Sequence, residues 1–168
     1  LIAEVAKQME AYDLPRSARP IQEFIDEFST WWLRRSRDRF KSDNEADKQQ
    51  ALTTFKYVLL ELSKVMAPFT PFIAEQVYRE VGGKLESVHL EKWPEAEKAD
   101  EKVIEDMELV RKAVELGLAK RSESGIKIRQ PLSELSVYGL NLNESVLAII
   151  ANEVNVKKVL INKSSEIK

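Results

Sequence analysis

The sequence predicts a mainly α-helical protein, in which a helical bundle is followed by a small α/β unit. Through residues 1–124, apolar side chains recur every three or four positions, the pattern of helices that bury one face. After Gly125, two short segments rich in β-branched residues flank one helical segment. We therefore predict two domains, a helical bundle at 1–124 and a small α/β junction subdomain at 125–168.

Five helices are expected in the bundle. Their approximate ranges are 1–13, 15–40, 45–66, 71–82 and 103–124. The second carries an apolar stripe of Ile21, Phe24, Ile25, Phe28, Trp31 and Trp32. Thr70 is a plausible N-cap for the fourth helix, Pro71 suits a first helical turn, and Gly82–Gly83 ends it. An extended loop then leads to the last helix.

The α/β subdomain is expected to contain strands at 135–139 and 154–161, separated by a helix at 143–153. Asn143 is the expected N-cap of that helix, because its amide oxygen can accept from a first-turn N–H.

Composition excludes several classes of site. The 168 residues contain no cysteine and one histidine, His89, so disulfides and thiolate metal sites are ruled out, and zinc or Cys/His catalysis is disfavoured. Five glycines form no phosphate-binding loop. No apolar run could span a membrane, and the N-terminus has no signal-peptide pattern. The chain starts without Met inside an amphipathic pattern, so we expect a piece of a longer protein. The absence of cysteine leads us to expect a cytoplasmic setting.

The net charge of −2 conceals an uneven distribution. Residues 31–41 carry four arginines and one lysine against one aspartate, and residues 119–130 carry four cations against one glutamate. Between them, residues 86–108 hold nine carboxylates and three lysines. The two basic segments therefore say more about partners than the overall charge does.

The arginines of "WWLRRSRDRF" admit two interpretations. At 100° per residue, Arg34 and Arg37 fall on the polar side of the helix, whereas Arg35 and Arg39 continue the apolar stripe. An arginine on that stripe needs a carboxylate partner or must extend its head to water. Either Arg35 and Arg39 stabilise the fold beside solvated neighbours, or this helix end binds a polyanion, with a tryptophan near to stack a base.

The segment "GIKIRQPL" raises the same alternatives. Lys127 and Arg129 alternate with two isoleucines, so we expect both charges on one face of an extended segment. That face is either an ordinary solvated strand face or a second set of phosphate contacts.

Four segments follow one another along the chain in an order that indicates a family: "SARPIQEFIDEFSTWWLRRSRDRF", "MAPFTPFIAEQVY", "SVHLEKWP" and "GIKIRQPL". Together they resemble the anticodon-binding region of isoleucyl-tRNA synthetases, which share a class I branch with the valyl and leucyl enzymes. The resemblance covers essentially the whole chain. "APFTPFIAE" and "SVHL..WP" look like features of the entire branch, whereas "WWLRRSRDRF" and "IRQPL" look more like the isoleucine member.

The resemblance implies a helical bundle that docks on the anticodon stem-loop of an isoleucine-accepting tRNA, followed by a small α/β junction. It implies a monomeric parent ligase that attaches isoleucine to tRNA, with ATP and Mg²⁺ bound in a catalytic domain outside this chain. Class I signatures of the "HIGH" and "KMSKS" type, editing sequences and zinc ligands are absent, so no catalytic residue, metal or cofactor is expected here. The implied tRNA-binding residues are Trp32, Arg34, Arg35, Arg37, Arg39, Lys41, Lys127, Arg129 and Gln130.

Two other functions stay open from the sequence. The chain could be the equivalent domain of a valyl- or leucyl-tRNA synthetase. It could also be a non-catalytic helical scaffold that binds only protein, with its arginines paired to the acidic 86–108 segment.

Overall fold

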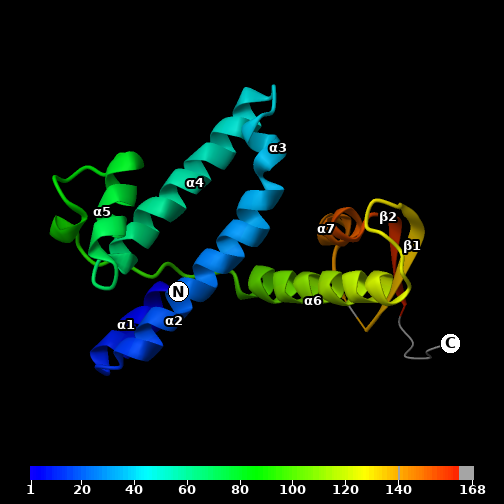
Figure 1. Ribbon diagram of the computed structural model, residues 1–168, viewed down its shortest axis with the longest axis horizontal. Helices are drawn as coiled ribbons and strands as arrows, with labels where there is room; N and C mark the ends of the chain where they lie inside the picture. Colours follow the sequence, from blue (N-terminus) through cyan, green and yellow to red (C-terminus); the bar gives the residue numbers. More distant parts are fainter. Residues whose placement is uncertain (140, 163–168) are drawn as a thin grey trace. The chain divides into compact units, whose positions relative to one another are not determined.

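The computed structural model describes residues 1–139 and 141–162, which fall into two compact units, Leu1–Glu97 and Lys98–Lys168 (Figure 1). Helices predominate among the described residues, and their two strands form one small parallel sheet. The predicted fold class, mainly α with a small α/β unit, is therefore confirmed. Within the described ranges, every helix is too short or too polar to cross a bilayer.

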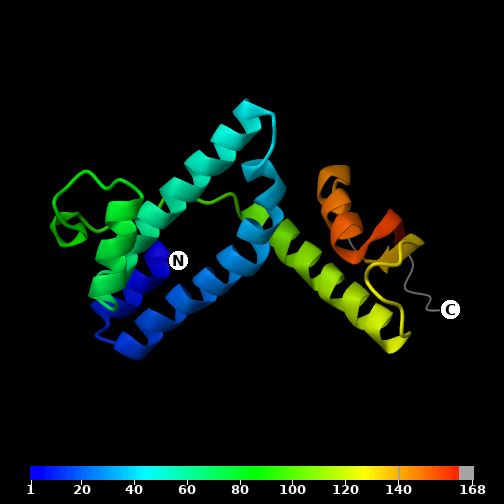
Figure 2. The same ribbon diagram turned by 45° about the horizontal axis from the view of Figure 1, so that its top comes forward.

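The first unit is built on one long helical rod and a helix that returns from its end. Figures 1 and 2 show α2 continuing through a π-helix into α3, after which the chain turns into α4. Its elements are α1 (Ile2–Glu10), α2 (Leu14–Glu27), the π-helix (Phe28–Leu33), α3 (Arg37–Phe40), α4 (Glu45–Met66), α5 (Pro71–Glu80) and a 3₁₀ turn (Val88–Leu90). The predicted helices at 1–13, 45–66 and 71–82 are confirmed with small differences at their ends.

Local sequence signals set these ends. The side chain of Asp13 accepts from the Arg16 N–H at 3.0 Å at the start of α2, and Asn44 accepts from the Asp47 N–H at 3.2 Å at the start of α4. Thr70 does occupy the N-cap position of α5, but its hydroxyl donates back to the carbonyl of Met66 instead of capping. Pro71 fills the first helical position, as predicted.

Two apolar clusters hold the first unit together. Val5, Ile21, Leu62 and Val65 join α1, α2 and α4. The second cluster contains the fully buried Tyr78 of α5, whose hydroxyl donates to Glu91 at 2.5 Å and accepts from the Leu85 N–H at 2.8 Å. These two bonds fasten the loop after α5 to the bundle.

The second unit contains α6 (Glu101–Glu123), β1 (Leu132–Tyr138), α7 (Glu144–Val154) and β2 (Val156–Asn162). The strands pair in parallel and are connected through α7, which confirms the predicted strand–helix–strand order. Asn143 caps α7 by accepting from the Val146 N–H at 3.2 Å, as predicted. Asn155 ends it in the left-handed conformation, with φ of 54°.

The buried face of α6 belongs to the second unit. Val110, Val114 and Gly117 lie on that face, and a Cβ on Gly117 would come within 3.0 Å of Val154 in α7. The sequence-based division at 124/125 grouped this helix with the bundle, whereas its packing groups it with α7 and the sheet.

Candidate nucleic-acid interface

A π-helix changes the phase of the arginine-rich segment. The line of partly or fully buried side chains from α2 through the π-helix to α3 follows every fourth residue and consists of Phe24, Phe28, Trp32, Ser36 and Phe40. The rings of Phe28 and Trp32 stack with centroids 5.0 Å apart and planes 8° from parallel. Ser36 is only 4% exposed. Because a π-helix fits more than 3.6 residues into a turn, residues four apart stay aligned there.

Side chains support this local geometry. The hydroxyls of Ser29 and Thr30 donate to the Asp26 carbonyl at 3.2 and 2.6 Å. Phe55 of α4 lies against both Phe28 and Trp32, with centroids 5.9 and 6.3 Å apart. A π-helix shifts the backbone hydrogen bonds by one residue, and side-chain donors and aromatic packing here stabilise the altered turn.

The changed phase corrects the expected position of Arg35. At 3.6 residues per turn it was expected on the buried stripe, but Ser36 occupies the buried position and Arg35 lies beside it, half-buried. Its guanidinium carbon sits 5.7 Å from the centre of the Trp31 ring. The guanidinium carbon of Arg34 is 5.9 Å from the centre of the same ring, and its Nε donates to the Thr30 carbonyl at 2.9 Å.

The two tryptophans have different surroundings. Trp32, the residue expected to stack on a base, belongs to the aromatic cluster with Phe28, Phe40 and Phe55. Trp31 instead has two guanidiniums over its ring, a cation–π arrangement. The structure therefore brings Trp31, rather than Trp32, together with the arginines.

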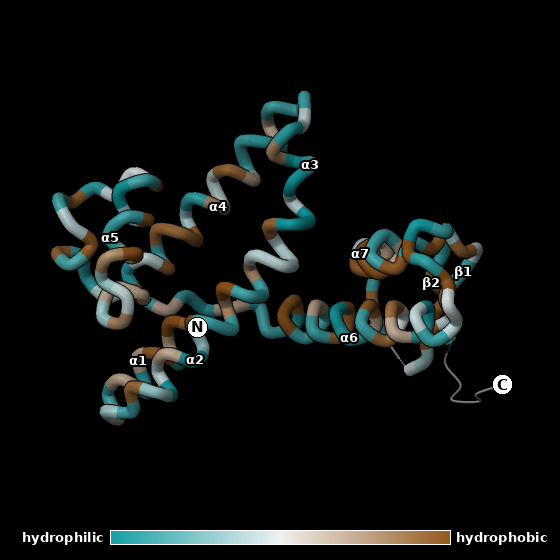
Figure 3. Tube along the Cα trace, in the orientation of Figure 1, coloured by the Kyte–Doolittle hydropathy of each residue, from teal (hydrophilic) through white to brown (hydrophobic). Residues whose placement is uncertain are grey.

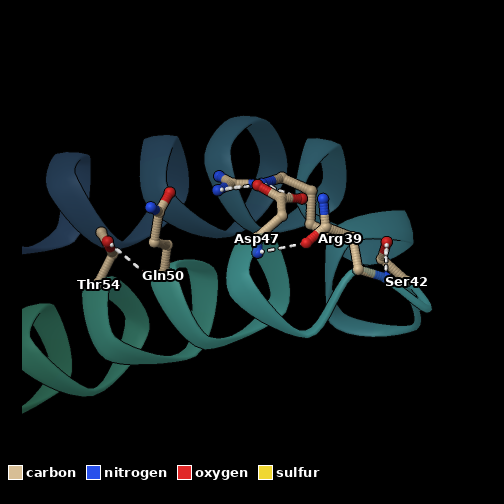
Figure 4. A network of polar contacts seen from close by, with 6 residues as sticks. Arg39, Ser42, Asp47, Gln50 and Thr54 are labelled. Atoms are coloured by element: carbon tan, nitrogen blue, oxygen red, sulfur yellow. Dashed lines mark hydrogen bonds and ion pairs between the residues drawn. The ribbon is translucent and has the colours of Figure 1, made fainter.

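Arg39 has the carboxylate partner that a half-buried arginine needs. Its Nη2 and Nε donate to Asp47 Oδ1 at 2.7 and 2.9 Å across the turn between α3 and α4 (Figure 4). The hydrogen bond from Arg39 holds the pKa of the Asp47 carboxyl below its usual value. Of the two sequence-based interpretations for Arg39, this geometry favours a structural role.

The remaining cations of the segment reach solvent. Arg34, Arg37 and Lys41 are exposed, and the tip where α3 turns into α4 is mostly hydrophilic (Figure 3). We call the exposed cations Arg34, Arg37 and Lys41, with Arg35 and Trp31, the arginine tip. Guanidinium groups donate in a planar fork that suits phosphate oxygens, and an aromatic ring is a surface on which a base can stack.

The second basic segment is a turn, not the expected extended strand. Lys127 to Gln130 close on themselves through a bond from the Gln130 N–H to the Lys127 carbonyl at 3.0 Å, and β1 starts only at Leu132. Lys127, Arg129 and Gln130 are all exposed. They are presented by a turn, so the predicted alternation of two faces does not apply.

Arg121 holds the backbone of this turn by hydrogen bonds. This role was not identified from the sequence. Arg121 is 5% exposed, and its Nη2 donates to the carbonyls of Lys127, at 2.6 Å, and Gln130. Asn155 adds a bond from its side-chain amide to the Ile128 carbonyl at 2.7 Å. The helical spacing of Val110, Val114, Gly117 and Arg121 was the available signal that this arginine faces inward.

The two basic groups belong to different units, and each is a candidate contact surface by itself. Among residues 1–139 and 141–162, no three acidic or histidine side chains gather as metal ligands. Exposed cations beside an aromatic ring are the kind of groups that recognise a polyanion such as RNA.

Comparison with known proteins identifies relatives. Residues 1–137 match the family described as "Anticodon-binding domain of tRNA ligase". The chain is 42% identical to the isoleucine–tRNA ligase of Dehalococcoides mccartyi (strain CBDB1), over 95% of the chain and 17% of that protein. It is 37% identical to the isoleucine–tRNA ligase of Protochlamydia amoebophila (99% and 17%) and 41% identical to that of Streptomyces coelicolor (93% and 16%). The chain thus spans about a sixth of the length of these relatives.

Proposed function

Because this chain belongs to the family of anticodon-binding domains of tRNA ligases, we propose that it binds the anticodon stem of an isoleucine-accepting tRNA. The observation that carries the proposal is the arginine tip. Exposed Arg34 and Arg37 share one helix end with an indole ring flanked by cations. Phosphate contacts position such a domain on RNA, and stacking with base-edge contacts gives selectivity.

The parent protein is proposed to be an isoleucine–tRNA ligase. The three relatives described above all bear that name, which supports isoleucine over the valine and leucine alternatives. In that protein, other domains would bind ATP and Mg²⁺ and attach isoleucine to tRNA, while this chain contributes RNA binding alone. We place the parent in the cytoplasm, acting in translation as a monomer, with tRNA and its own remaining domains as partners.

In the second unit, the turn from Lys127 to Gln130 is proposed as a further phosphate-contacting element. Its two cations and one amide are exposed, and buried Arg121 fixes the backbone that carries them. A rigid turn loses little conformational entropy on binding, which favours its use in recognition.

The test is a competition between tRNAs. Fluorescently labelled isoleucine-accepting tRNA is bound to the chain at fixed salt and displaced with unlabelled isoleucine-, valine- or leucine-accepting tRNA. We expect the isoleucine-accepting tRNA to compete best. Equal competition by all three would overturn the isoleucine assignment, and no binding at low salt would overturn the RNA-binding function itself. Selective binding would also rule out the protein-only scaffold.

A further inference from the structure

The second unit has an unpaired strand edge beside an apolar groove. In the described part of the chain, β1 pairs with β2 along one edge and has no strand along the other. A two-stranded sheet is only marginally stable, and an open edge invites unwanted pairing unless another element covers it. An open edge of this kind is a place where a further extended segment can pair.

The groove lies next to that open edge and is about 460 Å³ in volume. Its walls include Leu109 and Leu116 of α6 and Val137 and Tyr138 of β1. Three of these large side chains are well exposed: Leu109 at 39%, Leu116 at 58% and Tyr138 at 47%. Leu109 and Leu116 are seven residues apart, so they lie in one row along α6.

The geometry of β1 indicates what fits. Glu134 to Tyr138 pair with β2 without a break, and at the end of this ladder Gly139 donates its N–H to the Asn162 carbonyl on the β2 side. Alternate residues of a strand direct their N–H groups to opposite edges, so those of Glu134, Ser136 and Tyr138 face the open edge. An extended segment placed there would hydrogen-bond to these groups. Every second side chain of the segment would then pack against Leu109 and Leu116 of α6. A helix could fill the groove but would leave the strand edge unpaired.

We infer that the groove seats a third strand, supplied by an extended segment of the same polypeptide outside residues 1–168 and apolar at alternate positions. The relatives are about six times as long as this chain, since it covers 16–17% of them. A segment tethered in the same polypeptide docks at a high effective concentration and needs little intrinsic affinity. The inference rests on the proposed function only in placing this chain within a longer ligase.

Amide hydrogen exchange tests the inference. The 168-residue chain and the full-length ligase that contains it are compared at the amides of Glu134, Ser136 and Tyr138. We expect these three amides to exchange at least about tenfold more slowly in the full-length protein. Equal exchange rates in the two proteins would overturn the inference. So would slow exchange in the 168-residue chain that appears only as it dimerises in sedimentation, because the occupant would then be a second copy.

A variant in the groove separates strand docking from general stabilisation. Leu116→Lys puts a charge where the third strand would pack, so the three amides should exchange faster in the full-length protein. The melting temperature of the 168-residue chain should not change, because Leu116 is exposed there. The matched control is Glu108→Lys, which changes an exposed residue of α6 outside the groove lining. If both variants accelerate exchange equally, the groove is not the docking site.

These outcomes are independent of tRNA binding. A full-length ligase that binds tRNA but leaves the β1 amides unprotected contradicts the third strand alone. Protected amides in a protein that does not bind tRNA contradict the proposed function alone.

Discussion

Arg39 and Asp47 are joined by a two-point ion pair across the turn between α3 and α4, with Nη2 and Nε both within 2.9 Å of Oδ1. The pair connects the end of the arginine-rich helix to the first turn of α4. Both side chains are more than a third exposed, at 39% and 38%, so solvent screens the pair and its effect on stability is modest.

The pair gives stability a pH dependence. The hydrogen bond from Arg39 lowers the pKa of Asp47 below its ordinary 3.8, so its stabilisation is complete above that value and is lost as pH falls through the lowered pKa. Arg39→Met should lower the melting temperature by a few degrees at most at pH 7 and not at all in strong acid. Thermal melts at both pH values check this, with exposed Arg37→Met as the control. A difference that persists in acid would show that the packing of Arg39, rather than its ion pair, stabilises the turn.

Tyr78→Phe should destabilise the first unit. Removing the hydroxyl leaves the Leu85 N–H and the Glu91 carboxylate without their buried partner, which costs about 1–3 kcal/mol. Urea unfolding measures the change. Phe72→Leu, at a 90% exposed aromatic position of the same helix, is the control and should be nearly neutral. A neutral Tyr78→Phe would mean that the loop after α5 is held by packing alone.

Gly83→Ala should also destabilise this region, for a steric reason. A Cβ at Gly83 would lie 2.2 Å from the Tyr78 ring, so the ring or the loop must move, at about 1–3 kcal/mol. Unfolding of Gly83→Ala in a Tyr78→Leu background should show a smaller effect, because the clashing ring is gone. If the cost of Gly83→Ala is the same in both backgrounds, the ring contact is not its cause.

Arg121→Met should loosen the turn that carries Lys127 and Arg129. The carbonyls of Lys127 and Gln130 lose their buried donor, so the turn opens more often. Trypsin cleaves after lysine and arginine, and cleavage within the turn should become several-fold faster. Lys120→Met, at the exposed neighbouring position, should leave the cleavage rate unchanged. A rate unaffected by Arg121→Met would show that Asn155 and the chain connection suffice to hold the turn.

The helices and the α/β order could be predicted because their signals are local. Apolar periodicity, a proline at the first turn of α5 and the Asn143 cap each act within a few residues. The π-helix could not be predicted from a 3.6-residue period. It depends on Phe55, far along the chain, packing against Phe28 and Trp32, although the four-residue spacing of Phe24, Phe28 and Trp32 was a hint.

Only those features of the candidate site that depend on local sequence could be predicted. Exposure of Arg34 and Arg37 follows from polarity and agrees with the sequence, whereas the positions of Arg35 and Trp31 depend on the phase of the π-helix. The partner of Arg39 comes from the next helix, and the partners of Arg121 come from a turn that forms only when α6 ends. The apolar periodicity of one helix or strand does not show which residues of another element it contacts.

The central claim, that the arginine tip binds tRNA phosphates, is tested most directly by a salt titration of tRNA affinity. Arg34→Glu with Arg37→Glu is compared with Lys7→Glu with Arg19→Glu, which makes the same charge change at exposed positions of α1 and α2. We predict that the tip variant binds isoleucine-accepting tRNA more weakly and that its log–log salt slope flattens by about 0.7–0.9 for each phosphate that the protein no longer neutralises. The control should keep the wild-type slope, and both should melt like the wild type. If the two double variants weaken binding and flatten the slope equally, tRNA responds to net charge and not to this tip, which would contradict the claim.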